Sequence, residues 1–421
     1  MMKAKRWLLL VLLGTGCAAG DSDEDREAAR TEVQEDGRVA TAMASGSERL
    51  SAEELEAGRM RMDWRQWVER DTMGAAGDTA AVDTAQPELD ESWDDITVES
   101  VNRGPVVLPV FGDVAGPSVL RVQILLDRAR FSPGIIDGRW GSNTEKAVYW
   151  LQRREGLRPT GRVDRATWQR LQQLAGAAPE LVRTHTLTED DVAGPFVTLP
   201  EEYYDRRDME CQCYESLAEK LAETHHTSED LLRKLNPDLD LNAVRAGMTL
   251  NVPLVTRVAL QGAGPVNGTD SAAVAAASAA AGTVARLVIS DGGGYLHALD
   301  ARGRIVYHFP ATLGSDYSPS PTGDYRVTNI AHDPTWHYQP ELLEGVADDE
   351  PDAVLPAGPN NAVGVVWMQL SRPHYGIHGT SAPETIGYAT SNGCVRLTNW
   401  DAAFLSRRVS AGTPVQFRDV H

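Results

Sequence analysis

The chain has 421 residues, of which 42% are hydrophobic, enough for roughly two to four domains with sizeable cores. Its formal net charge is −20, from 60 acidic and 40 basic residues, and no basic patch stands out. These features exclude a nucleic-acid-binding surface, and no motif in the chain implies a cofactor.

The first 20 residues predict a secretory signal peptide. A basic start is followed by the apolar run Trp7–Leu13 and by small residues around Cys17. An apolar run this short is typical of a signal peptide and does not span a bilayer. The site before Cys17 resembles the lipobox of bacterial lipoproteins, which implies a diacylated Cys17 and an outer-membrane anchor facing the periplasm. Cleavage after Gly20 by ordinary signal peptidase is the alternative.

Residues 21–110 are acidic and rich in Gly, Ser and Thr. Such a segment buries too little apolar surface to offset chain entropy, so we expect a largely disordered tether. One stretch within it differs, because Ser51–Glu54 has the form of a capping box and precedes Trp64 and Trp67. A transient helix and a partner-docking helix are both open interpretations.

Residues 115–176 predict three short helices. Apolar residues recur at helical spacing after Pro117, a capping box at Ser142–Glu145 opens a second helix, and Gly156 is placed to end it. The loop Pro133–Gly141, with Asp137-Gly138 at its centre, resembles the "DGxxGxxT" loop of peptidoglycan-binding domains. The resemblance implies wall binding, and a helical spacer is the alternative.

Residues 181–256 predict an α+β domain with the order strand, helix, helix, strand. This βααβ pattern resembles the LysM domain, which implies binding of glycans that contain N-acetylglucosamine. A long insertion before the first helix departs from that pattern and carries Cys211 and Cys213. A disulfide involving these thiols is favoured over a metal site with His225 or His226, and the sequence leaves the pairing open.

Residues 257–283 are rich in Ala, Gly and Ser and predict a flexible linker, which would let a tethered enzyme search for partners. From residue 284 to 420, short strand-like runs separated by glycine turns predict a mostly-β sandwich. Thr398 or Asn399 is placed to cap a single helix after the last motif of this domain.

Cys394 lies in a context suited to nucleophilic chemistry. A free thiol has a pKa of about 8.5 and needs a base or a positive field to react, and His378 is the candidate base. Gly393 precedes the cysteine, so the N–H groups of Gly393 and Cys394 are candidates for an oxyanion hole. Arg396 shares a strand face with Cys394 if the segment is extended.

These residues resemble the signature of the L,D-transpeptidase catalytic domain, as His378-Gly379-Thr380 and Ser391-Asn392-Gly393-Cys394-Val395-Arg396-Leu397. The resemblance implies Cys394 as nucleophile, His378 as general base and then acid, the Gly379 carbonyl as its orienting group, and Arg396 as a substrate contact. The place of Asn392 is often His in relatives. The candidate walls of the substrate pocket are Tyr375, Thr380, Ser391, Asn392 and Trp367.

The function implied is an exported peptidoglycan L,D-transpeptidase that forms 3→3 cross-links or attaches another amine through a cysteine acyl-enzyme. Two alternatives remain open: a carboxypeptidase that trims stem peptides with water as acceptor, and a non-catalytic wall-binding protein. The intact set of His378, Cys394 and Arg396 argues against the last one.

Overall fold

The structure is a computed structural model, and it describes residues 39–41, 91–176, 180–257, 260, 284–315, 318–343 and 351–418. The signal peptide with Cys17, most of the tether and most of the linker lie outside these described residues. Among the described residues, no helix has the length and apolar character needed to cross a membrane.

The last part of the predicted tether is folded, which corrects the expectation for residues 91–110. It contains the 3-10 helix η1 (Trp93–Asp95) and helix α4 (Val98–Arg103), which is capped by Thr97. Ile96 and Val101 are buried in a core that they share with α5 and α10. These apolar residues lie within an acidic stretch, so the average composition of the tether concealed a segment able to pack.

Three helices form the next region, as predicted: α5 (Pro117–Arg128), α6 (Ser142–Glu155) and α7 (Arg165–Leu174). Helix α6 ends at Gly156, whose φ of 70° is the left-handed conformation that favours glycine. The predicted capping box at Ser142 is not formed, because Gly141 is the N-cap and Ser142 is already helical.

The middle region has the predicted strand, helix, helix, strand order in β2 (Val182–Thr186), α9 (Leu217–Thr224), α10 (Glu229–Leu235) and β3 (Thr249–Pro253). Strands β2 and β3 pair antiparallel, with Val182 opposite Pro253. The insertion after β2 begins with the short helix α8 (Glu189–Val192) and includes the 3-10 helix η2 (Tyr204–Asp208).

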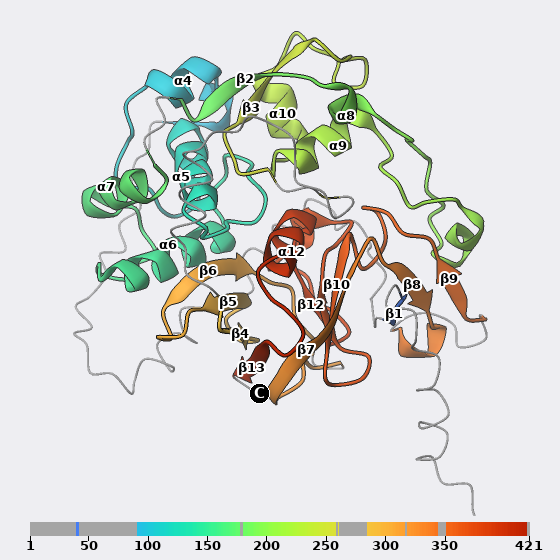
Figure 1. Cartoon of the computed structure of the whole chain (residues 1–421). Coiled ribbons are helices and arrows are strands. Elements are labelled where there is room, and N and C mark those ends of the chain that lie inside the picture. Colours follow the sequence, from blue (N-terminus) through green and yellow to red (C-terminus); the bar gives the residue numbers. More distant parts are fainter. Residues whose placement is uncertain are drawn as a thin grey trace, which may run out of the picture. The chain divides into compact units, whose positions relative to one another are not determined.

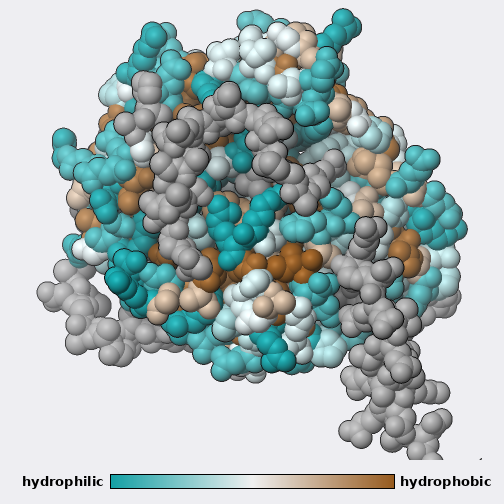
Figure 2. All heavy atoms as spheres, viewed as in Figure 1, coloured by the Kyte–Doolittle hydropathy of each residue, from teal (hydrophilic) through white to brown (hydrophobic). Residues whose placement is uncertain are grey.

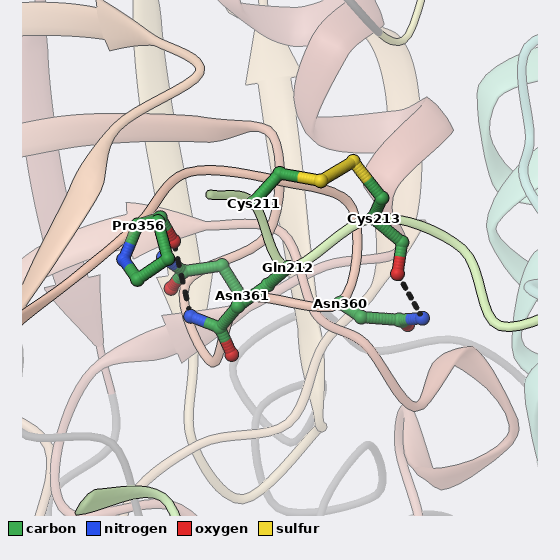
Figure 3. The surroundings of a disulfide bond; sticks show 6 residues. All are labelled: Cys211, Gln212, Cys213, Pro356, Asn360 and Asn361. Carbon is green, nitrogen blue, oxygen red and sulfur yellow. Dashed lines mark hydrogen bonds between the residues drawn. A yellow bond between two sulfur atoms is a disulfide. The ribbon is translucent and has the colours of Figure 1, made fainter. Parts of the chain in front are cut away.

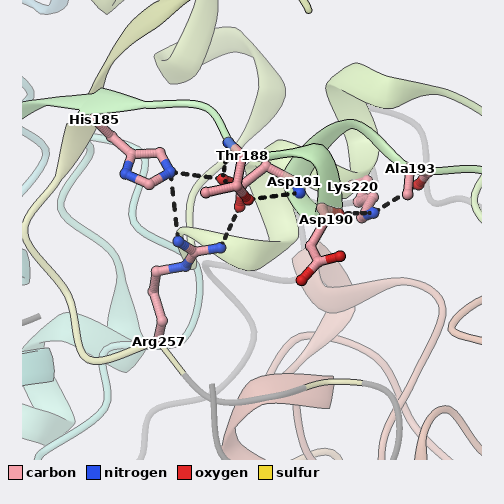
Figure 4. Close-up of polar contacts among 7 residues, drawn as sticks. All are labelled: His185, Thr188, Asp190, Asp191, Ala193, Lys220 and Arg257. Atoms are coloured by element: carbon pink, nitrogen blue, oxygen red, sulfur yellow. Dashed lines mark hydrogen bonds and ion pairs between the residues drawn. The ribbon is translucent and has the colours of Figure 1, made fainter. Parts of the chain in front are cut away.

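A buried carboxylate holds the start of this insertion against the two-stranded sheet (Figure 4). Asp191 Oδ2 lies 2.8 Å from His185 Nε2 on β2 and accepts hydrogen bonds from the N–H and hydroxyl of Thr188, and Arg257 Nη2 lies 2.5 Å from Asp191 Oδ1. Lys220 Nζ on α9 donates to the carbonyls of Asp190 and Ala193, each at 2.6 Å. The start of the insertion is therefore held in place against β2 and α9.

Its other end is held by the Cys211–Cys213 disulfide segment (Figure 3). Gln212 donates from its backbone N to Ala357 O at 2.9 Å and from its side chain to Pro356 O at 3.0 Å, and its own carbonyl accepts from Asn360 N at 3.0 Å. The two cysteines thus pair with each other. Among the described residues, no group of three or more His, Cys, Asp or Glu is placed to hold a metal ion.

The C-terminal region is mostly β, as predicted. Its strands are β4 (Arg286–Ser290), β5 (Tyr295–Leu299), β6 (Ile305–Pro310), β7 (Gly323–His332), β10 (Val366–Leu370), β11 (Gly376–His378), β12 (Val395–Arg396) and β13 (Pro414–Arg418). They form one eight-stranded sheet with the order β12-β11-β10-β7-β13-β4-β5-β6. A second sheet has the order β1-β8-β9, from β1 (Val39–Thr41), β8 (Thr335–Tyr338) and β9 (Ala353–Leu355).

Helix α12 (Asn399–Ser406) packs against both ends of the large sheet, so the sheet curves around it (Figure 1). Phe404 meets Tyr307 of β6 edge-on, with 5.0 Å between the ring centroids, and α12 also contacts β10 and β11. The side chain of Thr398 caps this helix by accepting from Asp401 N. Two 3-10 turns complete the region, η3 (Pro340–Leu342) and η4 (Pro383–Thr385).

The helical region packs directly on the large sheet rather than standing apart from it. Trp150 of α6 lies edge-on to Tyr295 and to His297 of β5, with centroid distances of 5.0 and 4.6 Å. Lys146, fully buried at the same interface, has its Nζ 3.5 Å from Gly294 O. The face shown in Figure 2 is mostly hydrophilic, with a run of apolar residues near its centre.

Replacing Lys146 by Met should stabilise the fold at neutral pH. Burial lowers the pKa of Lys146 from 10.5 to about 8, so folding at pH 7 carries the cost of a buried charge. We expect Lys146→Met to raise the free energy of unfolding at pH 7 by about 3 kcal/mol, measured by denaturant titration.

The pH dependence provides the control for this prediction. Because the folded pKa is depressed, the wild-type protein gains stability as the pH rises from about 8 towards 10.5, and the Met variant lacks that gain. The difference between the two proteins should therefore shrink over this range. A difference that stays constant would show that the charge of Lys146 is not the cause.

Candidate functional site

Parallel pairing of two short strands brings His378 and Arg396 to one face of the large sheet. β11 and β12 pair in parallel, with His378 opposite Arg396 and Ile377 opposite Val395. Opposite residues point to the same side of a sheet, and so do residues two apart along an extended segment. His378 and Arg396 therefore share one face, and Cys394, in the bend before β12, belongs to the same buried cluster as Trp367, the residue opposite His378 on β10.

The His378 imidazole is oriented as a proton acceptor. Its Nδ1 lies 2.7 Å from Gly379 O, a hydrogen bond in which the ring nitrogen must be the donor, so the lone pair is on Nε2. The Nε2 atom is buried and has no hydrogen-bond partner among the described residues. Burial first, and then the charge of Arg396, lowers the pKa of His378 to about 3, so the imidazole is neutral at physiological pH. Trp367 stacks on this ring at 5.5 Å.

The Cys394 thiol is enclosed and lies near the guanidinium of Arg396. Cys394 is 1% exposed, and its Sγ lies 3.6 Å from the carbonyl of His374, whose φ of 64° is left-handed. Arg396 is buried as well; burial lowers the pKa of its guanidinium, and the neighbouring Tyr203 and Cys394 raise it. Arg396 thus lies within electrostatic reach of Cys394, whose thiol donates to the His374 carbonyl.

The turn before Cys394 is held by hydrogen bonds of the Ser391 hydroxyl. Gly393 has a φ of 98°, and a Cβ there would lie 2.7 Å from the Tyr375 ring. Its N–H donates to Ser391 Oγ at 3.2 Å, and that hydroxyl donates to Cys394 O at 2.6 Å. The Gly393 N–H thus has an acceptor within the turn, and the oxyanion-hole role of the Gly393 and Cys394 N–H groups remains a prediction.

The five predicted pocket walls differ in their contacts, and only Tyr375 is not fully buried. Trp367, Thr380 and Ser391 are each buried, and they make the stacking and turn contacts that hold the motif together. Tyr375 is half-buried beside Gly393 and has the Arg372 guanidinium 4.6 Å from its ring centre. Asn392 is buried, and its Nδ2 has no hydrogen-bond partner among the described residues. All five residues remain predicted substrate contacts.

Asn399, which we expected only as a possible helix cap, joins the segments around the base. Its Oδ1 accepts hydrogen bonds from Val365 N and Thr380 N, each at 3.1 Å. A Cβ at Gly364 or at Gly379 would lie 2.0 or 2.1 Å from that oxygen. The Thr380 amide immediately follows Gly379, so Asn399 fixes the peptide whose carbonyl orients the imidazole.

A carboxyl from the middle region completes this network. Asn399 Nδ2 donates to Glu223 Oε1 at 2.7 Å and to Pro359 O at 3.1 Å. Burial raises the pKa of Glu223 to about 8, although hydrogen bonds with Tyr214 and Asn399 oppose the rise. Glu223 is thus protonated at neutral pH. The one sign of this role in the sequence is that Glu223 lies on the apolar side of a short helix.

A second candidate site is a cavity of about 390 Å³ beside the Asp137-Gly138 loop. That volume lies within the range of about 300–1,000 Å³ typical of small-molecule sites. Carboxylate, amide, hydroxyl and aromatic side chains from four parts of the chain line it. They include Trp93, Gln123, Asp137, Asn143, Asp230 and Tyr388.

Two segments of this chain match known domain families. Residues 285–417 match the L,D-transpeptidase catalytic domain, and residues 115–171 match the putative peptidoglycan binding domain. The putative L,D-transpeptidase YkuD of Bacillus licheniformis is 28% identical over 47% of this chain and 90% of its own length. Its namesake in Bacillus subtilis is 32% identical over 28% of this chain and 56% of its own length.

A third relative, the probable L,D-transpeptidase YbiS of Escherichia coli K12, is 47% identical over 20% of this chain. The match spans 28% of YbiS, so the chain covers only about a quarter of that relative and about half of the Bacillus subtilis protein. The family match at residues 285–417 includes His378 and Cys394.

Replacing Glu223 by Gln should remove one pH dependence of stability. Gln keeps an acceptor for Asn399 and cannot ionise. The folded pKa of Glu223 is raised from 4.5 to about 8, so its contribution is complete below pH 4.5 and is lost as the pH rises through about 8. Between these limits the wild type should lose on the order of 4 kcal/mol relative to Glu223→Gln in denaturant titrations.

The matched control is Glu215→Gln, an exposed carboxyl in the same region. Its stability should follow the wild-type pH profile. A Glu223→Gln protein that is destabilised equally at every pH would show that Glu223 is ionised in the fold.

Proposed function

From an L,D-transpeptidase catalytic domain at residues 285–417, we propose an exported enzyme that forms 3→3 cross-links in peptidoglycan through a thioester on Cys394. One observation carries this proposal. His378 has its proton on Nδ1, fixed by Gly379, and an Nε2 without a hydrogen-bond partner among the described residues, on the sheet face that holds Arg396 and beside the buried cluster that contains Cys394. This arrangement suits acyl transfer by a thiol.

In the first half-reaction, the Cys394 thiol gives its proton to His378 Nε2, and the sulfur attacks the carbonyl of the third stem residue of a donor tetrapeptide. Arg396 stabilises the negative charge on sulfur before attack. The imidazolium then returns its proton to the nitrogen of the terminal D-residue. The C–N bond breaks, and a thioester remains.

In the second half-reaction, the side-chain amine of a diaminoacid on a neighbouring stem attacks the thioester. His378 takes a proton from this nitrogen, an amide forms, and the sulfur leaves and recovers the proton. Another amine can replace the stem amine as acceptor, and water as acceptor gives a carboxypeptidase. The enclosed position of Cys394 favours the amine, because an active site that excludes bulk water suppresses hydrolysis.

The other regions are proposed to hold the enzyme on the wall. Residues 115–176 are its peptidoglycan-binding domain, and the cavity near Asp137 is the proposed contact for glycan or stem peptide. Residues 181–256 act as a LysM-like glycan-binding domain, supported by the pairing of β2 with β3 around α9 and α10. A signal peptide at 1–20 and lipidation of Cys17 place the tethered enzyme in the periplasm.

Incubation of the chain without its first 20 residues with disaccharide-tetrapeptide tests the reaction. Mass spectrometry should detect a dimer at the summed mass less one D-alanine, and Cys394→Ala should give none because no thioester can form. Monomer shortened by one residue would instead identify a carboxypeptidase.

A second variant separates chemistry from folding. Glu215→Gln changes an exposed carboxyl outside the site and should retain the thioester, which intact-protein mass spectrometry detects as an added acyl mass. Unchanged substrate with the wild type and with both variants would contradict the proposed enzyme.

A further inference from the structure

The catalytic residues are closed off from solvent in this fold. Cys394 is 1% exposed and His378 0%, yet a stem peptide must bring a carbonyl carbon into contact with the sulfur. Some segment must therefore move or yield before the reaction, as in enzymes whose loops gate access to the site. The question is which segment covers the thiol.

The insertion that interrupts the middle region packs on the cluster that contains the thiol. Cys394, Trp336, Tyr338 and Trp367 belong to one buried apolar cluster, and Tyr203 and Tyr204 of the insertion pack against it. Tyr203 meets Trp336 edge-on with 5.2 Å between ring centroids, and Tyr204 lies 6.3 Å from Tyr338. The insertion thus covers one side of the cluster that contains Cys394.

Tyr203 also lies within electrostatic reach of the catalytic arginine. After burial, which lowers the pKa of Arg396, the Tyr203 phenol has the largest effect on it and raises it. The Arg206 guanidinium lies 4.5 Å from the Tyr203 ring centre and donates from Nε to Pro200 O at 2.8 Å. These contacts hold the Tyr203 ring in place from within the insertion.

Both ends of the covering segment are anchored, and ring contacts join its middle to the cluster. At one end Val197 N donates to Tyr214 O at 3.0 Å. At the other, Gln212 between the paired cysteines is hydrogen-bonded to Pro356, Ala357 and Asn360 (Figure 3). Between them, residues 198–210 present Tyr203 and Tyr204 to the cluster. Ring contacts yield to a ligand at lower cost than a strand ladder does.

We propose that residues 198–210 form a cover over the nucleophile and that Tyr203 is a specificity-determining wall of the acyl-donor site. The stem peptide displaces Tyr203 to reach Cys394 while the Cys211–Cys213 anchor stays in place. This proposal rests on the proposed function for the identity of the substrate. The cover comes from another region of the chain than the catalytic sheet, so substrate selection depends on the middle region.

Alkylation of Cys394 tests the cover without any turnover. The chain without its first 20 residues is treated with iodoacetamide or with a bulky maleimide under non-reducing conditions, and modification is followed on the Cys394 peptide by mass spectrometry. We expect Tyr203→Ala to speed maleimide modification roughly tenfold, the factor that corresponds to about 1.4 kcal/mol of lost closure. The increase for iodoacetamide should be smaller.

Matched variants distinguish a cover from general loosening. Tyr203→Phe keeps the ring and should react like the wild type. Phe196→Ala removes a 38% exposed ring from the same insertion and should also react like the wild type. Replacing Cys211 and Cys213 together by Ser releases the anchor and should speed alkylation.

Equal alkylation rates for wild type and Tyr203→Ala, with thermal unfolding showing both folded, would overturn the proposal. So would equal acceleration by Phe196→Ala. Because alkylation needs no substrate, a protein that lacks cross-linking activity and still shows the Tyr203 effect would count against the proposed function and leave the cover standing.

Discussion

The hydrogen bonds of one buried amide, Asn399, determine the geometry of the proposed base, His378. Its oxygen holds Val365 N and Thr380 N, and its nitrogen holds Glu223 and the Pro359 carbonyl. Each of these groups is buried and would cost about 1–3 kcal/mol if left without a partner. The peptide that orients His378 is therefore fixed by a side chain on α12 and, through it, by α9 of the middle region.

This constraint makes the regions interdependent. His226, beside the middle helices, stacks on Trp400 at 5.1 Å, and Ser132 of the helical region donates to Asp401 at 2.7 Å. Burial raises the pKa of Asp401 to about 7, although hydrogen bonds with Ser132 and Thr398 oppose the rise. The first two turns of α12 thus receive contacts from both preceding regions.

Local sequence patterns predicted the helices and strands and pointed to the candidate reacting groups. The helices at 117–174, the βααβ order and the pair His378 and Cys394 each depend on spacing over a few residues, and spacing is visible in one chain. Asn399, Glu223 and Tyr203 were missed because their roles depend on contacts between segments far apart in sequence. The use of the Gly393 N–H by Ser391 was missed for a related reason, since it depends on the exact path of one turn.

The contacts of α12 bear on the search for inhibitors. A fragment beginning at residue 284 would keep the sheet, His378 and Cys394 but would lose Glu223 and Tyr203. It would expose the Trp400 ring to water and leave Asn399 Nδ2 without its carboxyl acceptor. Compounds selected against such a fragment would meet Cys394 without the Tyr203 cover and a less firmly held His378 imidazole. Compounds selected against the intact chain must instead fit beneath the Tyr203 ring.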